Sequence, residues 1–230
     1  MTIWHRLGSI IDDGAGAVGS LIDWAGSLFA GDPAARRQVA FSVAMIALSA
    51  KMARADGVVT SDEVAAFRSI FVVVPSEERN VTRLFDLAQR DIAGFETYAR
   101  RIAGLYGDDR PGLEDVVDGL FAIARADGAI HAAELAYLAR VAEIFGLPPE
   151  EFERIASRHV IPEEGDPYVI LGIARGTEFA LIRRHYLGLV AENHPDRLIG
   201  RRLPPEAIAL ATERLAAINR AYERIERERR

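Results

Sequence analysis

Apolar residues recur along most of the chain at the three-to-four-residue spacing of amphipathic helices. Apolar helical runs in the first two thirds of the chain cover residues 41–52, 64–74, 84–101, 116–123 and 135–145, with a further helix at 149–158. A short helical turn at 168–173 and helices at 178–192 and about 205–225 follow in the last third. The pattern predicts an all-α protein with a helical bundle over residues 33–159 and a separate C-terminal helical module.

Residues 1–32 form an amphipathic segment of their own. Apolar residues between positions 3 and 29 are spaced like one face of a helix, and three Asp residues interrupt the opposite side. No basic stretch precedes a short apolar core, so we expect neither a secretory signal nor a membrane-spanning helix. Two interpretations stay open: a helix packed on the rest of the protein, and peripheral membrane contact through residues 1–30, with Trp4 and Trp24 near the ends.

The predicted bundle contains an internal repeat. Ala-Arg-Ala-Asp-Gly occurs at residues 53–57 and again at 124–128, and a Glu follows each Asp by seven positions. The Gly of each copy is expected to end a helix, because glycine accepts the left-handed conformation required there. Thr60 to Glu63 form a capping box for the next helix, and His131 takes the place of Thr60 in the second copy. The repeat therefore predicts a duplicated helix hairpin.

This repeat resembles the paired Ala-Asp-Gly…Glu signature of the TerB-like helical domain of tellurite resistance proteins, and the resemblance covers residues 33–159. It implies that acidic residues of the two copies gather a divalent cation. The candidate ligands are Asp56, Glu63, Asp127 and Glu134. In the alternative interpretation these residues cap helices and pair with neighbouring arginines, and the protein needs no cofactor.

The C-terminal module, residues 168–230, follows a polar linker at residues 160–167. Gly172 is expected to end its first helical turn, and Thr177 can cap the helix that follows. That helix should break at His194-Pro195-Asp196, because the residue before a proline disfavours helix. An arginine-rich loop then leads to the last helix.

Several short stretches lie in register through this module. They are Asp166-Pro167-Tyr168 with Leu171-Gly172, Ile182-Arg183-Arg184 with Tyr186 and Leu189, His194-Pro195-Asp196, and Ile218-Asn219-Arg220-Ala221-Tyr222. Together they resemble a J domain. The string from His194 to Glu206, and the TerB-like domain that precedes the module, look like the DjlA type of DnaJ-like co-chaperone.

The resemblance implies a co-chaperone that docks on a DnaK-type chaperone and stimulates that partner's ATP hydrolysis. The TerB-like domain would direct it to a client or a location, and the client is unknown. The residues expected to contact the chaperone are His194, Pro195, Asp196, Arg183, Arg184, Arg197 and Tyr186. An alternative from another class is a metal-responsive or stress-sensing TerB-like module with a weakened J domain.

The chain departs from the family pattern at three positions of this module. Leu187, Gly188 and Glu192 stand where J domains usually carry cations. Either docking is weaker than usual, or Arg201 and Arg202 compensate.

Composition narrows the function further. The net charge of −6 divides into −9 for residues 1–165 (16 basic, 25 acidic) and +3 for residues 166–230 (12 basic, 9 acidic), which argues against nucleic-acid binding by the whole chain. There is no Cys, so disulfides and thiolate metal sites are excluded, and a cytoplasmic location, with attachment to the inner membrane face as an alternative, is expected. The sequence contains no P-loop, zinc-protease or nucleophile-elbow motif, so we expect no enzyme.

Overall fold

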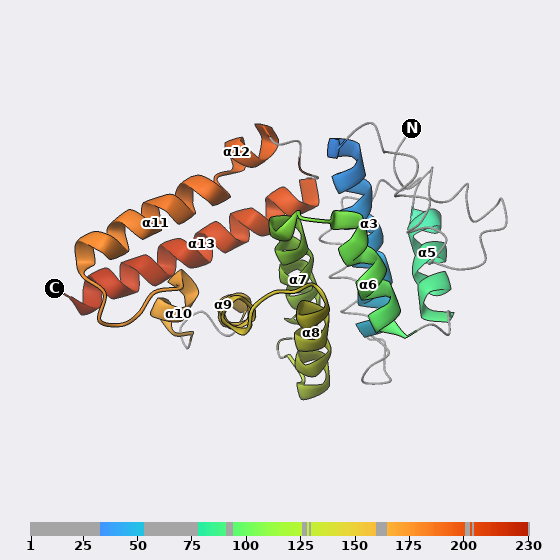
Figure 1. Ribbon diagram of the computed structural model, residues 1–230, viewed down its shortest axis with the longest axis horizontal. Coiled ribbons are helices and arrows are strands. Elements are labelled where there is room, and N and C mark those ends of the chain that lie inside the picture. Colours follow the sequence, from blue (N-terminus) through green and yellow to red (C-terminus); the bar gives the residue numbers. More distant parts are fainter. Residues whose placement is uncertain are drawn as a thin grey trace. The chain divides into compact units, whose positions relative to one another are not determined.

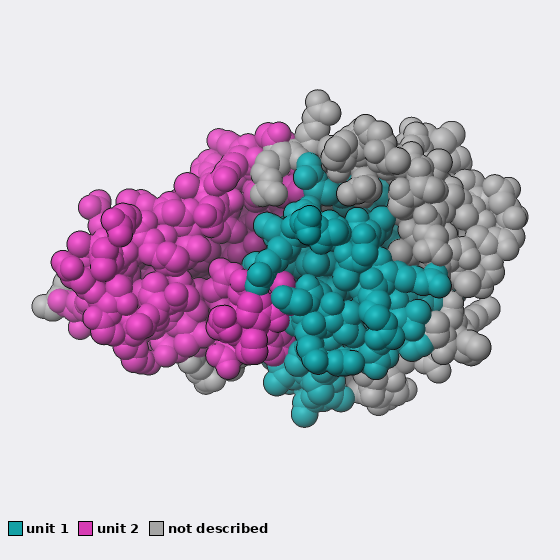
Figure 2. Space-filling view, viewed as in Figure 1, with its two compact units in different colours: residues 1–146 teal, residues 147–230 magenta. Residues whose placement is uncertain are grey.

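The computed structural model describes residues 33–52, 78–90, 94–125, 128, 130–159, 165–200, 203 and 205–229. These ranges contain ten helices and no strand (Figure 1), which confirms the predicted all-α class. The chain divides into two compact units, residues 1–146 and residues 147–230, which Figure 2 shows in two colours.

The first unit is built around one buried helix, α3 (Pro33–Met52). Every side chain from Val39 to Ala50 is buried. A helix that is apolar almost all round is stable only when other elements cover it. That cover comes from α5 (Glu78–Arg90), α6 (Phe95–Tyr106) and α7 (Arg110–Ala124), which all pack against α3.

The apolar run at residues 84–101 forms parts of two helices, α5 and α6. Gly94 is the N-cap residue of α6, with an extended backbone (φ −63°, ψ 151°). Glycine weakens a helix by about 1 kcal/mol relative to alanine, so a break at this position disturbs the run least.

The second repeat copy forms the predicted hairpin, in which α8 (Ala132–Ile144) packs against α7 and α6. Gly128 has the expected positive φ, 105°. However, α7 already ends at Ala124, so this glycine shapes the turn between the helices and does not cap α7 as predicted. In that turn the N–H of Gly128 donates to the carbonyl of Arg125 at 3.0 Å. The turn and second helix of the first copy lie in residues 53–77, outside the described residues.

The second unit contains α9 (Pro149–His159), α10 (Pro167–Leu171), α11 (Phe179–Asn193), α12 (Pro195–Gly200) and α13 (Pro205–Glu228). The helices α11 and α13 run antiparallel and side by side, and α10 packs against α13 and α9 (Figure 1). Their shared core consists of Tyr168, Ile170, Leu171, Ile182, Leu189, Ile218, Ala221 and Ile225. The domain boundary predicted between residues 159 and 160 stays a prediction.

Among the described helices, none has the length and apolar character needed to span a membrane. The amphipathic segment at residues 1–32 lies outside the described residues, and so does the expectation of membrane contact through residues 1–30.

Candidate functional site

The candidate site lies on α11, which is fixed against α13 by aromatic and polar contacts. The Tyr186 hydroxyl donates to Oδ1 of Asn219 at 3.1 Å. The Tyr186 ring stacks on Tyr222, with centroids 4.0 Å apart and planes 10° apart. Tyr186 is therefore half-buried and already has partners within its own unit, although the sequence predicted it as a contact with the chaperone.

At its start, α11 is positioned by the short helix α10. Asp166 caps α10, because its Oδ1 accepts the N–H of Tyr168 at 3.0 Å. Gly172 ends α10, as the sequence predicted, and its backbone is left-handed (φ 67°). Nε2 of His185 lies 2.8 Å from the Leu171 carbonyl, which joins the middle of α11 to the end of α10.

Thr177 does not cap α11 as the sequence predicted. The N-cap residue is Glu178, and its side chain makes no capping hydrogen bond. Instead, the backbone N–H of Thr177 donates to the Ala174 carbonyl at 3.0 Å in a turn of the preceding loop. The helix therefore begins one residue later than this cap would place it, and packing of Ile182 in the core stabilises it.

At its other end, α11 stops at a bend formed by His194, Pro195 and Asp196. His194 has an extended backbone (φ −66°, ψ 129°), the conformation that a following proline favours. Asn193 secures the helix end, because its Nδ2 donates to the Leu189 carbonyl at 2.8 Å and its Oδ1 accepts from Arg214 at 3.3 Å.

The segment after the bend is helical at first, whereas the sequence predicted a loop. Pro195 starts α12 with a fixed φ that suits the first position of a helix. Leu198 of α12 is buried, and its N–H and that of Arg197 both point to the His194 carbonyl, at 3.3 and 3.1 Å. The buried leucine holds this turn in place.

The bend is exposed and presents two polar groups. The side chain of His194 is 50% exposed and that of Asp196 is 86% exposed. The backbone N–H of Asp196 donates to Nδ1 of His194 at 3.3 Å, and an oxygen of the Asp196 carboxylate lies 3.7 Å from the same nitrogen. The bend is exposed and is not part of a strand. This agrees with the sequence, which predicted a bend that contacts the chaperone.

Exposed arginines lie on the two helices that meet at the bend. Arg183 and Arg184 lie on α11, and Arg197 lies on α12. Leu187 follows Arg183 by one helical turn, and its side chain is 52% exposed. Arg201 and Arg202 lie outside the described residues, so the compensation expected from them stays a prediction.

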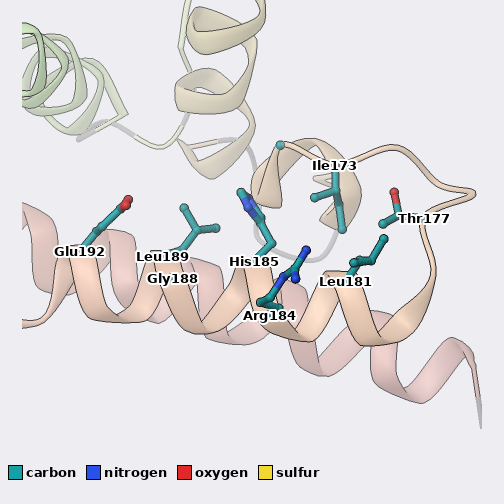
Figure 3. A pocket seen from close by; sticks show the side chains of 9 residues that line it. Ile173, Thr177, Leu181, Arg184, His185, Gly188, Leu189 and Glu192 are labelled. Carbon is teal, nitrogen blue, oxygen red and sulfur yellow. The ribbon is translucent and has the colours of Figure 1, made fainter.

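A groove of about 480 Å³ lies beside Arg184, between α11 and the loop that follows α10 (Figure 3). Its apolar lining includes Ile173, Leu181 and Leu189, and the charged residues along it are Arg184 and Glu192. Sequence reasoning missed this groove, because the loop and the helix that form it are brought together only by folding. The available signal was Gly188, an unexplained glycine inside a helix.

Of the four acidic residues of the repeat, Glu134 alone is among the described residues. Asp56, Glu63 and Asp127 lie outside the described residues. Oε2 of Glu134 accepts the backbone N–H of His131 at 2.8 Å and so helps to cap α8. In the described part of the chain, no three His, Asp or Glu residues group as metal ligands would. The divalent-cation site stays a prediction.

Comparison with known proteins covers both units. The family model described as "Tellurite resistance protein TerB" matches residues 42–157. The chain is 25% identical to "Co-chaperone protein DjlA" of Vibrio cholerae over 89% of this chain and 83% of that protein. It is 26% identical to the DjlA of Aliivibrio fischeri over 84% of this chain and 80% of that protein. It is 28% identical to the DjlA of Escherichia coli over 46% of this chain and 48% of that protein.

No solved structure matches the chain significantly. The relatives are named as co-chaperones and not as enzymes, in agreement with the prediction from the sequence. The predicted likeness to DjlA-type proteins is confirmed over most of the chain.

Proposed function

Because the chain belongs to the TerB family and is similar to DjlA co-chaperones over most of its length, we propose that it is a co-chaperone of a DnaK-type chaperone. The C-terminal module acts as a J domain, docks on the chaperone and stimulates its ATP hydrolysis. The TerB-like domain brings the complex to a client or a location. The absence of Cys suits a reducing compartment, and we propose that the protein acts in the cytoplasm.

The observation that carries this proposal is the exposed bend between two helices that carry exposed arginines. We define the docking surface as His194, Pro195, Asp196, Arg183, Arg184 and Arg197. His194 and Asp196 offer directional hydrogen-bonding groups, and Pro195 limits the conformations of the bend. A surface that is ordered before binding loses less entropy when the partner arrives.

The arginines supply attraction over a longer range. Positive charge on the docking surface speeds association with an acidic partner, and this effect weakens as salt is added. Each exposed ion pair contributes only about 0.2–1 kcal/mol, so the arginines act as a group.

The chaperone performs the chemistry in this proposal. The co-chaperone contributes binding energy, which favours the chaperone conformation that hydrolyses ATP. It can shift that equilibrium only by the difference between its affinities for the two conformations. Residues that contact only the hydrolysing conformation should therefore affect the maximal rate most.

The test is the ATPase rate of a DnaK-type chaperone with the purified full-length chain and with His194→Gln. His194 is half exposed, so the variant should fold, and circular dichroism with thermal melting checks that it does. Glu223→Gln, at an exposed position of α13 outside the docking surface, is the matched control. We expect stimulation by the unaltered chain and by the control, and little by His194→Gln. Equal rates for all three folded proteins would refute the proposal.

A further inference from the structure

We propose that the groove beside α11 receives an apolar side chain of the same chaperone. Docking then relies on apolar burial at positions where other J domains rely on cations. This inference rests on the proposed function and names a second contact for the same partner.

Gly188 is the first observation behind it. This glycine lies inside α11, where glycine lowers helix stability relative to alanine. A Cβ built at Gly188 would meet no atom within 4 Å, and the backbone there is that of an ordinary helix. Nothing in the described part of the unit therefore requires a glycine. A glycine at such a position lets another molecule approach the helix backbone closely.

The groove itself fits an apolar group. Ile173, Leu181 and Leu189 offer apolar surface, and the volume of about 480 Å³ is ample for a leucine or phenylalanine side chain. Figure 3 shows these side chains on α11 and on the loop opposite, with Arg184 and Glu192 along the same helix. The opposite charges define the occupant further. Its apolar side chain should have a carboxylate on the Arg184 side and a cation or amide on the Glu192 side.

The groove is continuous with the docking surface, and this identifies the occupant as the chaperone. Arg184 belongs to both, so a partner bound to the arginines reaches the groove without a second docking event. Leu187 is the neighbour of Gly188 in the sequence and is 52% exposed. Gly188 and Glu192 stand at two of the positions where the family pattern has cations, and both line the groove.

The experiment measures ATPase stimulation of a DnaK-type chaperone against the concentration of the full-length chain. Gly188→Leu fills the groove, Gly188→Ala adds a single methyl group, and Glu223→Leu adds the same leucine at an exposed position of α13 that does not line the groove. We expect Gly188→Leu to raise the half-maximal concentration roughly tenfold or more, because it excludes a buried apolar side chain of the partner. The maximal rate should change little, because the bend is intact, and Glu223→Leu should match the unaltered chain.

Gly188→Ala distinguishes a role of Gly188 in docking from a structural role. It should raise the melting temperature, because alanine favours helix, and yet raise the half-maximal concentration. This variant also decides the matter if Gly188→Leu does not fold.

The outcomes separate the two proposals. If the unaltered chain stimulates and both Gly188 variants have its half-maximal concentration, the groove proposal is overturned and the co-chaperone function stands. If the unaltered chain stimulates no more than His194→Gln, both proposals are overturned.

Discussion

The hydroxyl of Tyr137 donates a hydrogen bond to the backbone carbonyl of Leu48 at 2.8 Å and so joins α8 to the central helix α3. Both residues are buried, and the Tyr137 ring also packs on Phe95, with centroids 4.4 Å apart. A buried hydrogen bond between two elements fixes their positions more closely than apolar packing alone, since its geometry is directional.

Tyr137→Phe should destabilise the protein, because the ring packing stays while the hydrogen bond to Leu48 is lost. The expected loss is about 1 kcal/mol in the free energy of unfolding. Tyr106→Phe is the matched control. The Tyr106 hydroxyl is also buried but has no hydrogen-bond partner among the described residues, so its removal should be neutral or slightly stabilising. Urea denaturation measures both, and a larger loss for Tyr106→Phe would contradict this interpretation.

The same two tyrosines should make the protein sensitive to high pH. Burial raises the pKa of Tyr137 well above its ordinary value of 10.0, with a smaller contribution from Glu96. Burial also raises the pKa of Tyr106, and Asp115 and Asp109 add to the effect. Because the folded-state pKa lies above the unfolded-state value, the stability is intact below about pH 10 and is lost as the pH rises beyond it.

Each tyrosine should contribute a slope of about 1.4 kcal/mol per pH unit above that point. Urea denaturation at a series of pH values measures the slope, and Tyr106→Phe with Tyr137→Phe should reduce it. An unchanged slope in the double variant would show that other groups cause the alkaline unfolding.

Tyr186→Phe separates a structural role of this residue from a contact with the chaperone. The variant keeps the stack on Tyr222 and loses the hydrogen bond to Asn219, so we expect about 0.5–1.5 kcal/mol lower stability. Chaperone stimulation should be retained when the variant is folded, because this hydroxyl is used within the unit. Stimulation as low as that of His194→Gln, without a loss of stability, would instead make Tyr186 a direct contact.

The sequence predicted those features whose cause is local. The end of a helix at Gly172 and the break at His194 follow from one residue and its neighbour, and both predictions are confirmed. The burial of α3 was also foreseeable from its apolar residues. The all-α fold class and the exposed bend could therefore be predicted without coordinates.

Features that depend on packing were not predictable in the same way. Local chemistry favours Thr177 over its neighbour Glu178 as the N-cap of α11, yet the N-cap is Glu178, so the start of this helix depends on packing. The helix α12 depends on burial of Leu198, and the arginine-rich sequence around this residue does not indicate that it is buried. The groove at Gly188 requires the loop after α10 to meet α11 in space.

Gly172 and Gly188 lie in the same unit and should respond in opposite ways to replacement by alanine. Gly172 has φ 67°, where a side chain is strained, and a Cβ there would lie 3.5 Å from Cδ of Arg154, an ordinary contact. The cost of Gly172→Ala is therefore the strain of the backbone, and this substitution should lower the stability by about 1–2 kcal/mol. Gly188→Ala should raise the stability by up to about 1 kcal/mol, because alanine favours the helix and its Cβ displaces no neighbouring atom.

Thermal melting of the two variants beside the unaltered chain measures this contrast. If both replacements lowered the stability, Gly188 would have a structural role within the protein, and the argument that it leaves room for a partner would lose its premise. If Gly188→Ala alone is stabilising, the natural glycine lowers the stability of its own helix, as the groove proposal requires.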